Sequence, residues 1–207
     1  ISVRKNGKIV VVSPPLVPKF LISKFIDQNK SWIETQKKKV SKNKFIDQDF
    51  VMIFGKKYEI KLEETLGPSK IELKEKTIII KLHSPQELSF DPSNPPAVLT
   101  RFLKNTAQHY ITKKTSNMSK KMGLSYGKIS FRSQRTRWGS CSSLGNLNFN
   151  INLIHFPPLV IDYVIIHELA HRKHMDHSRN FWQLVEKYQP DYRLHRGWLK
   201  RRGSTID

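Results

Sequence analysis

The sequence is short of three features: cysteine pairs, long apolar runs and acidic residues. Its single cysteine, Cys141, cannot form an internal disulfide, and this fits a reducing compartment. No apolar run approaches the roughly 18 residues of a membrane-spanning helix, so a membrane partner is not expected. The charged segment 1–8 is not followed by the apolar core of a signal peptide. We therefore expect a cytoplasmic globular protein, and Ile1 in place of methionine leaves the native start of the chain open.

Acidic residues number 17 against 37 lysines and arginines, which gives a formal net charge of +20. Residues 92–161 contain no Asp or Glu at all but many Lys and Arg. Such a charge attracts polyanions, so nucleic acid is a candidate partner. Lysine-rich chains also carry solvated lysine faces without any partner, and composition does not separate the two readings. The candidate polyanion contacts are Lys128, Arg132, Arg135 and Arg137.

The apolar patterns favour a mixed α+β chain with two regions. Residues 2–13 predict a hairpin around an Asn-Gly turn, and the spacing of apolar residues over 19–40 predicts one amphipathic helix. Short β-branched runs over 50–82 predict an antiparallel sheet. A Pro- and Ser-rich segment follows and is the expected boundary. Residues 1–90 would then form a small N-terminal region, and 91–207 a second domain.

The second region begins with a long predicted helix, because residues 98–118 carry one apolar stripe. Residues 128–137 predict a strand, and residues 147–153 alternate between apolar side chains and asparagines, as in a half-buried strand. The segment 159–172 starts almost entirely apolar and predicts a buried helix. A further helix is expected over 179–188.

The buried helix ends in the pattern HExxH at residues 167–171. Its two imidazoles and carboxylate would lie in or beside the core, where polar groups without partners are costly. Residues four apart share a helical face, with Cβ atoms about 5–6 Å apart, so His167 and His171 can reach one zinc ion. Glu168 lies about 100° around the helix from His167. The spacing therefore predicts zinc held by the two histidines, with Glu168 as the catalytic base acting on water.

A catalytic zinc site needs a third protein ligand and one open position. On a straight helix, His174 would lie about 10.5 Å along the axis from His167, too far to share one ion. A turn before a helix capped by Ser178 would instead bring His177 back to the ion. His177 is therefore the predicted third ligand, with His174 or a distant carboxylate such as Glu186 as the alternatives.

Several short motifs occur in a fixed order along the C-terminal part of the chain. They are RWGSCS at 137–142, HExxH at 167–171, His177-Ser178, Phe181-Trp182, PDY at 190–192 and His195-Arg196. This series resembles the YgjP-like (DUF45) family of predicted metal-dependent hydrolases. The resemblance is specific over residues 128–202 and looser in the N-terminal hairpin and helix.

The resemblance implies both a fold and an activity. The family belongs with the zincin metallopeptidases and is similar to SprT-like and WLM-type proteases. The implied fold is a zincin-like domain with an antiparallel or mixed sheet packed on the active-site helix, preceded by a small α+β region. The implied activity is zinc-dependent hydrolysis of peptide or protein substrates, with His167, His171 and His177 as ligands and Glu168 as base.

Other residues have candidate roles that compete with structural ones. His195, Tyr192 and Arg196 are candidates to stabilise the oxyanion of a tetrahedral intermediate, with packing or helix capping as the alternative. Cys141 is better explained as a small turn residue than as a ligand or nucleophile. In zincins the strand before the active-site helix can pair with an extended substrate, and residues 147–153 fit that place.

A rival hypothesis is a basic nucleic-acid-binding module with a structural zinc ion. A structural site is closed by a fourth protein ligand, whereas a hydrolase keeps one position for water. A third reading joins the two, with a basic surface that brings a peptidase to proteins bound to nucleic acid. The sequence names neither the physiological substrate nor the oligomeric state.

Overall fold

The computed structural model forms two compact units, Ile1–Asp47 and Gln48–Asp207. It describes residues 1–3, 9–35, 45–83, 90–134 and 137–201. Residues 48–90, which the sequence patterns group with the N-terminus, share their unit with the HExxH helix. This division differs from the expected boundary after residue 90, because the sheet built by these residues packs on the helices that follow it.

The N-terminal unit contains a short antiparallel pair, β1 (Ser2–Val3) with β2 (Ile9–Val10), as the predicted hairpin requires. Its Asn-Gly turn lies outside the described residues. Helix α1 (Lys19–Gln28) ends at Asn29, whose side-chain amide donates to the Phe25 carbonyl at 2.8 Å. Residues 30–35 are helical again. The single helix predicted over 19–40 is therefore interrupted at an asparagine cap, and its last five residues lie outside the description.

The second unit opens with a four-stranded sheet in the order β3-β4-β6-β5. Its strands are β3 (Phe50–Ile53), β4 (Lys56–Glu64), β5 (Lys70–Lys74) and β6 (Thr77–Leu82). β4 and β6 run parallel, and the other pairs are antiparallel, so the sheet is mixed rather than purely antiparallel. The central strand β6 places Ile78, Ile79 and Ile80 in the core.

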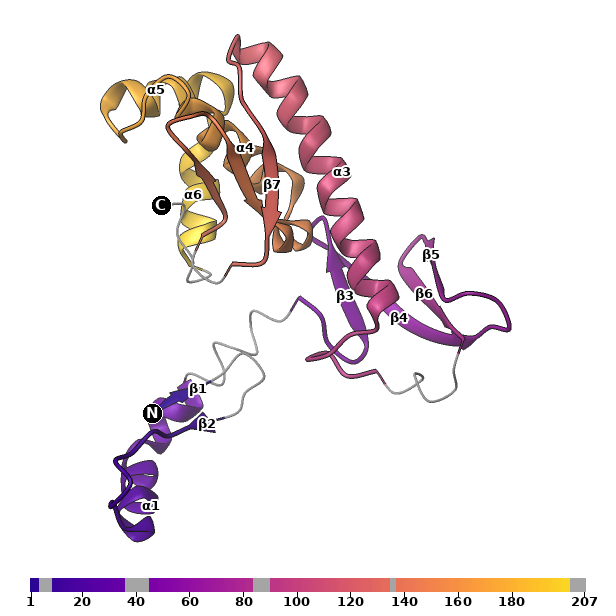
Figure 1. The fold of residues 1–207 in the computed structure, drawn as a ribbon, viewed down its shortest axis with the longest axis vertical. Coiled ribbons are helices and arrows are strands. Elements are labelled where there is room, and N and C mark those ends of the chain that lie inside the picture. Colours follow the sequence, from indigo (N-terminus) through magenta and orange to yellow (C-terminus); the bar gives the residue numbers. More distant parts are fainter. Residues whose placement is uncertain (4–8, 36–44, 84–89, 135–136, 202–207) are drawn as a thin grey trace. The chain divides into compact units, whose positions relative to one another are not determined.

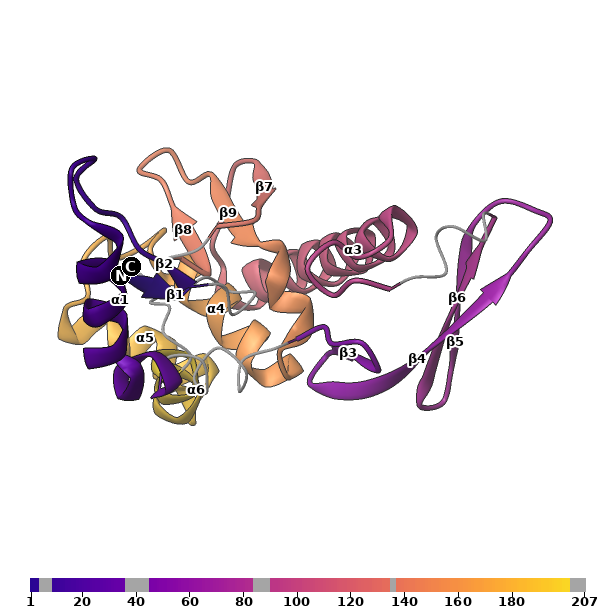
Figure 2. The same ribbon diagram turned by 90° about the horizontal axis from the view of Figure 1, so that it is seen from below.

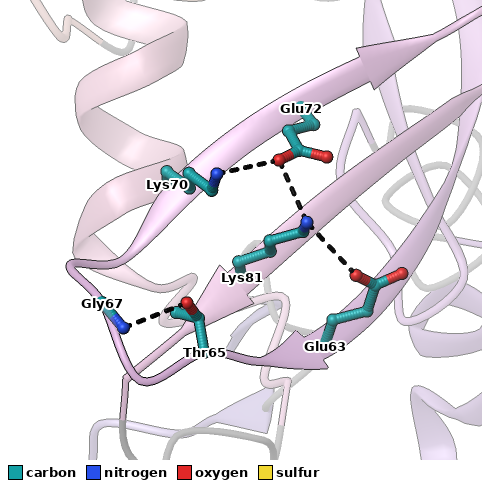
Figure 3. A network of polar contacts seen from close by, with 6 residues as sticks. All are labelled: Glu63, Thr65, Gly67, Lys70, Glu72 and Lys81. Atoms are coloured by element: carbon teal, nitrogen blue, oxygen red, sulfur yellow. Dashed lines mark hydrogen bonds and ion pairs between the residues drawn. The ribbon is translucent and has the colours of Figure 1, made fainter.

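The exposed surface of this sheet carries a small charged network (Figure 3). Lys81 reaches Glu72 at 3.0 Å and Glu63 at 3.7 Å, and Lys70 reaches Glu72 at 3.1 Å. These partners hold the pKa of Glu72 below its usual value. The network joins three neighbouring strands, and because it is solvated it contributes little to the free energy of unfolding.

Helix α3 (Ala97–Met122) confirms the long helix predicted from one apolar stripe. Leu99, Leu103, Ala107 and Ile111 are buried at intervals of four residues. The helix ends at Gly123, which adopts a left-handed conformation at φ 66°. It contacts β5 and the second half of the unit, and Figures 1 and 2 show it running from the first sheet to the elements around α4.

A second sheet follows, with strand order β7-β9-β8. Its strands are β7 (Ile129–Arg132), β8 (Gly139–Cys141) and β9 (Leu147–Asn150), and β9 leads into the 3₁₀ helix η2 (Ile151–His155). The strand predicted over 147–153 thus ends early, because the Asn150 side chain accepts from the Asn152 amide and caps η2. Asn150 was expected on a solvated face and is instead buried, donating to the Gln134 and Arg137 carbonyls.

Three helices complete the unit: α4 (Pro158–Ala170), α5 (Arg179–Tyr188) and α6 (Tyr192–Lys200). The tip of the β3–β4 hairpin sits on the start of α4, where the Phe54 amide donates to the Ile154 carbonyl at 2.7 Å. Gly55 has φ 75°, and a Cβ there would lie 2.9 Å from the Pro157 side chain. The fold is α+β, as predicted. Within the described residues, no helix combines the length and apolar character needed to cross a bilayer.

Candidate metal centre

Helix α4 carries the HExxH residues through the middle of the second unit. It begins at Pro158, whose fixed φ suits the first helical position. Every residue from Tyr163 to Ala170 is buried, because α3, α5, α6 and strand β8 all contact the helix. The apolar character of this segment on all sides is therefore explained by burial on all sides.

The chain turns directly after the helix, as the third-ligand argument requires. The His174 amide still donates to the Ala170 carbonyl, and no helix resumes until Arg179. His177 lies in this connection and is exposed, whereas His167 and His171 keep only 1% and 6% of their surface exposed. Two buried imidazoles thus come from one helix, and an exposed one comes from the loop that follows.

Three imidazoles converge at this point. Nε2 of His167 lies 3.3 Å from Nε2 of His171 and 3.2 Å from Nε2 of His177. The candidate ligand atoms of all three residues lie within 4.8 Å of one another. Among the described residues, no other group of three His, Cys, Asp or Glu side chains is arranged in this way. His174 and Glu186, the alternatives considered for the third ligand, are not in the group.

His174 contributes to the site through its backbone. Its carbonyl lies 3.1 Å from Nδ1 of His171, so the Nδ1–H of that ring donates to it. A hydrogen bond on one ring nitrogen fixes the tautomer and leaves Nε2 with its lone pair toward the other imidazoles. The turn after α4 therefore orients His171 as well as delivering His177.

Glu168 packs against strand β8 and is fully buried. A Cβ built on Gly139 would touch Oε1 of Glu168 and lie 2.7 Å from its Cγ and Cδ. The space for the carboxylate exists only because residue 139 has no side chain. Sequence reasoning missed this role of Gly139, although a glycine inside the RWGSCS motif marked a place of close approach.

Phe181 and Trp182, at the start of α5, surround the three imidazoles. The Phe181 ring is fully buried, with centroid distances of 4.9 Å to His167, 4.6 Å to His171 and 4.8 Å to His177. Trp182 is half-buried and stacks on His177 at 5.5 Å with an interplanar angle of 25°. Both rings pack directly on the candidate ligands.

The candidate oxyanion residues lie on α6. Tyr192 is buried and stacks on Trp182 at 5.3 Å, and the Arg196 guanidinium lies 4.5 Å from the centre of the Trp182 ring. The His195 ring lies 6.5 Å from the Tyr163 ring, and burial lowers its pKa against the opposing influence of nearby aspartates. Tyr192 and Arg196 thus contact the Trp182 ring, which in turn stacks on His177.

The remaining candidates lie at the surface. Lys128, Arg132 and Arg137 are exposed, and Arg135 lies outside the described residues. Cys141 is half-buried at the end of β8, with its Sγ 3.5 Å from the Ser142 carbonyl. It is the last residue of the strand and not the turn residue that was expected: the tight turn follows it, where the Gly145 amide donates to the Ser142 carbonyl.

Two buried imidazoles at the end of α4, joined by a third from the following loop, form a cluster that could hold a metal ion. The chain belongs to the YgjP-like family, whose metallopeptidase-domain model matches residues 1–202. It is therefore a metallopeptidase. The predicted relation to SprT-like and WLM-type proteases stays a prediction.

Two solved structures resemble part of the chain. One is the metallopeptidase zymogen of Pyrococcus abyssi abylysin, at 20% identity and a TM-score of 0.43, covering 47% of this chain and 99% of that one. The other is the metallopeptidase zymogen of Methanocaldococcus jannaschii jannalysin, at 17% identity and a TM-score of 0.41, covering 44% of this chain and 95% of that one. No curated protein matches the chain.

Proposed function

We propose that this chain is a zinc-dependent peptidase in which His167, His171 and His177 hold the ion and Glu168 is the general base. The observation that carries the proposal is the convergence of three Nε2 atoms. Two nitrogen ligands about 2.0–2.1 Å from one zinc ion, at a tetrahedral angle, lie roughly 3.3–3.4 Å apart. The Nε2 atom of His167 lies 3.3 Å from Nε2 of His171 and 3.2 Å from Nε2 of His177, within about 0.2 Å of that spacing.

The number of side chains favours a catalytic over a structural site. A structural zinc ion is usually closed by four protein ligands, whereas three ligands leave one position for water or substrate. Within the part of the chain that the structure describes, the group contains three His side chains and no fourth His, Cys, Asp or Glu. The rival reading, a nucleic-acid-binding module with a structural zinc site, lacks the fourth ligand that it needs.

The protein groups supply positioning and proton transfer. A bound zinc ion would act as a Lewis acid toward the scissile carbonyl and would lower the pKa of water. Glu168 takes the proton from the attacking water and passes it to the leaving nitrogen, so that the C–N bond breaks with release of a neutral amine and not of an amide anion. Gly139 keeps the carboxylate against β8, and His174 keeps the His171 ring in the required tautomer.

Strand β8 is the place at which an extended substrate can bind. The expectation that residues 147–153 pair with substrate is wrong, because β9 lies between β7 and β8 and both of its edges are occupied. In the described part of the sheet, β8 has a strand on one side only. A peptide that added to its other edge would lie beside Gly139 and hence beside Glu168.

The Glu168→Gln variant tests the proposed mechanism. We expect it to keep its fold and its zinc content and to lower kcat by about 100- to 10,000-fold, because the amide cannot accept the proton. Turnover of a library of quenched fluorescent peptides, together with metal analysis, measures both quantities. The matched control is Glu186→Gln, an exposed carboxylate on α5 that should change neither. Parental turnover in Glu168→Gln would remove the mechanism.

A second candidate function is nucleic-acid binding, and helix α3 favours it. The helix contains no acidic residue, and its solvent side exposes Arg101, Lys104, Lys113, Lys120 and Lys121. Of its basic residues, Lys114 pairs with Asp162 at 3.0 Å. Exposed cations without acidic neighbours on the same helix suit a phosphate backbone. Lys128, Arg132 and Arg137, which are also exposed, stay candidate contacts.

A further inference from the structure

His177 differs from the other two imidazoles in how its position is fixed. His167 and His171 are buried in α4, so the helix backbone and the core restrict their rings. His177 lies in the loop before α5 and is exposed. Besides its contacts with the other two imidazoles, its ring stacks on Trp182 and meets Phe181 edge-on at 4.8 Å and 73°. An exposed loop side chain loses rotamer freedom when it is ordered, so such contacts influence how readily it binds a cation.

Trp182 is in turn held by helix α6. Tyr192 stacks on it at 5.3 Å and 16°, and the Arg196 guanidinium lies 4.5 Å from its ring centre. Residues four apart share one helical face, so α6 presents both side chains to the indole together. Leu199, buried at 2% exposure, anchors the same helix in the core. The indole also lies 5.8 Å from the His167 ring and 5.0 Å from the Phe181 ring, but the imidazole that stacks on it is that of His177.

We propose that Trp182, Tyr192 and Arg196 form a positioning stack that fixes the His177 ring and so sets the affinity of the metal centre. The inference rests on the proposed metal role of His177. None of the three residues needs to touch metal or substrate. They act through His177, and helix α6 becomes a structural determinant of metal retention. The oxyanion role considered for Tyr192 and Arg196 stays a separate prediction.

The surface position of the stack argues for a role beyond core packing. Arg196 and His177 are exposed, and Trp182 is half-buried, so the stack lies at the rim of the site. The buried Phe181 already fills the apolar space beside all three imidazoles. A guanidinium over an indole face is a favourable cation–π contact that also restrains the ring. The stack therefore restrains the imidazole that the core restrains least.

The test measures zinc affinity by competition with a chromophoric chelator, and the visible spectrum after Co²⁺ loading. Loss of partners that orient a metal ligand typically lowers affinity about 10- to 100-fold, and we expect this for Trp182→Ala. Arg196→Ala should lower affinity about 2- to 5-fold, as expected for one exposed cation–π contact. Trp182→Phe should restore part of the loss. The matched control is Lys200→Ala, which removes one exposed charge from the same helix and should bind zinc as the parent does.

A double-variant cycle shows whether the stack acts through His177. In a His177→Ala background there is no imidazole to position, so adding Arg196→Ala should leave the remaining zinc affinity unchanged. An equal loss in both backgrounds would overturn the proposal, as would parental affinity in Trp182→Ala. Thermal unfolding of the metal-free proteins checks folding, and Arg196→Ala keeps the test decisive if Trp182→Ala does not fold. If the parent itself binds no zinc, the proposed function fails. If the parent binds zinc and the variants bind it equally well, only the positioning stack fails.

Discussion

Gly139 shows how much of the candidate site depends on one missing side chain. The Glu168 carboxylate occupies the volume that a Cβ on residue 139 would need. Protein interiors are packed too closely for such an overlap to be absorbed without a shift of either the strand or the carboxylate. A carboxylate that transfers protons must stay within hydrogen-bond reach of its water, so a small shift has a large effect on rate.

The Gly139→Ala variant is expected to lower kcat by at least about 10-fold while zinc content stays close to parental, because the three atoms nearest to a Cβ at residue 139 all belong to Glu168. Steady-state kinetics and metal analysis measure the two effects separately. Gly197→Ala is the matched control: a Cβ there meets only Arg201 Nη1, at 3.5 Å. In that helical position alanine should leave kcat unchanged and raise stability by up to about 1 kcal/mol. Parental kcat in Gly139→Ala would contradict the account of Glu168.

At the scale of elements, His155 joins η2 to strand β3. Its Nδ1 donates to the Met52 carbonyl at 2.6 Å, and the ring is 6% exposed. Burial lowers the pKa of His155 to about 4, against a smaller opposing influence of the Met52 carbonyl. This contact ties the first sheet to the segment that leads into α4, and so it supports the start of the active-site helix.

The pH dependence of stability follows from that shift. Because the folded pKa lies below the unfolded value of about 6.5, the unfolded chain binds the proton more readily between these two values. Stability from His155 is therefore fully present above about pH 6.5 and is lost as pH falls to about 4, with a total of about 3 kcal/mol. Urea unfolding at pH 7 and pH 4.5 measures it.

His155→Gln is the control for this prediction. The glutamine amide can still donate toward Met52 but does not titrate, so the variant should lose less stability between pH 7 and pH 4.5 than the parent. The rest of the chain is the same in both proteins, so its contribution to the pH dependence cancels in the comparison. Equal losses of stability in the two proteins would show that the burial of His155 does not contribute to the pH dependence of stability.

Sequence patterns predicted the helices whose buried residues follow a single local periodicity. The apolar stripe of α3 and the all-round apolar start of α4 each have a clear period, and both helices are present. The strand over 147–153 was too long because its alternating asparagines fit both a solvated strand face and a cap. The side chain of Asn150 serves as the cap and is buried by loop carbonyls that lie 13 and 16 residues earlier. Such long-range partners cannot be inferred from periodicity.

The same distinction applies to the candidate site: local spacing predicted some of its residues, whereas contacts between distant segments were missed. HExxH spacing predicted two imidazoles and a carboxylate, and the need for a turn predicted His177, and the structure brings the three histidines together. The contacts of Gly139 with Glu168, and of α6 with Trp182, join segments that lie far apart in the sequence. No spacing rule connects these positions. Whether the three histidines hold zinc stays a prediction.

At the scale of the whole molecule, the net charge of +20 makes nucleic acid a candidate partner. The salt dependence of the binding affinity tests whether α3 makes the contact. If α3 contacts a phosphate backbone, affinity should fall steeply with salt, because each neutralised phosphate releases counterions. The variant Lys113→Glu/Lys120→Glu should weaken binding and reduce the salt slope by about 2. Fluorescence anisotropy with a labelled DNA duplex between 50 and 200 mM salt, as roughly the informative range, measures both.

The control for that test is Lys61→Glu, an exposed lysine on β4 among acidic neighbours. It changes the net charge without touching α3 and should leave the salt slope unchanged. The same loss of affinity in both variants would mean that net charge alone attracts the DNA, and binding independent of salt would exclude a phosphate contact. Either result would leave the peptidase proposal intact, since that depends on the three imidazoles.

Zinc-edge X-ray absorption on the zinc-loaded protein tests the central claim most directly. The account predicts one ion with three imidazole nitrogen donors at about 2.0–2.1 Å and one lighter donor from water, and the loss of one imidazole in His177→Ala. A sulfur donor, a fourth protein ligand, or a spectrum unchanged by His177→Ala would contradict a catalytic centre built from His167, His171 and His177.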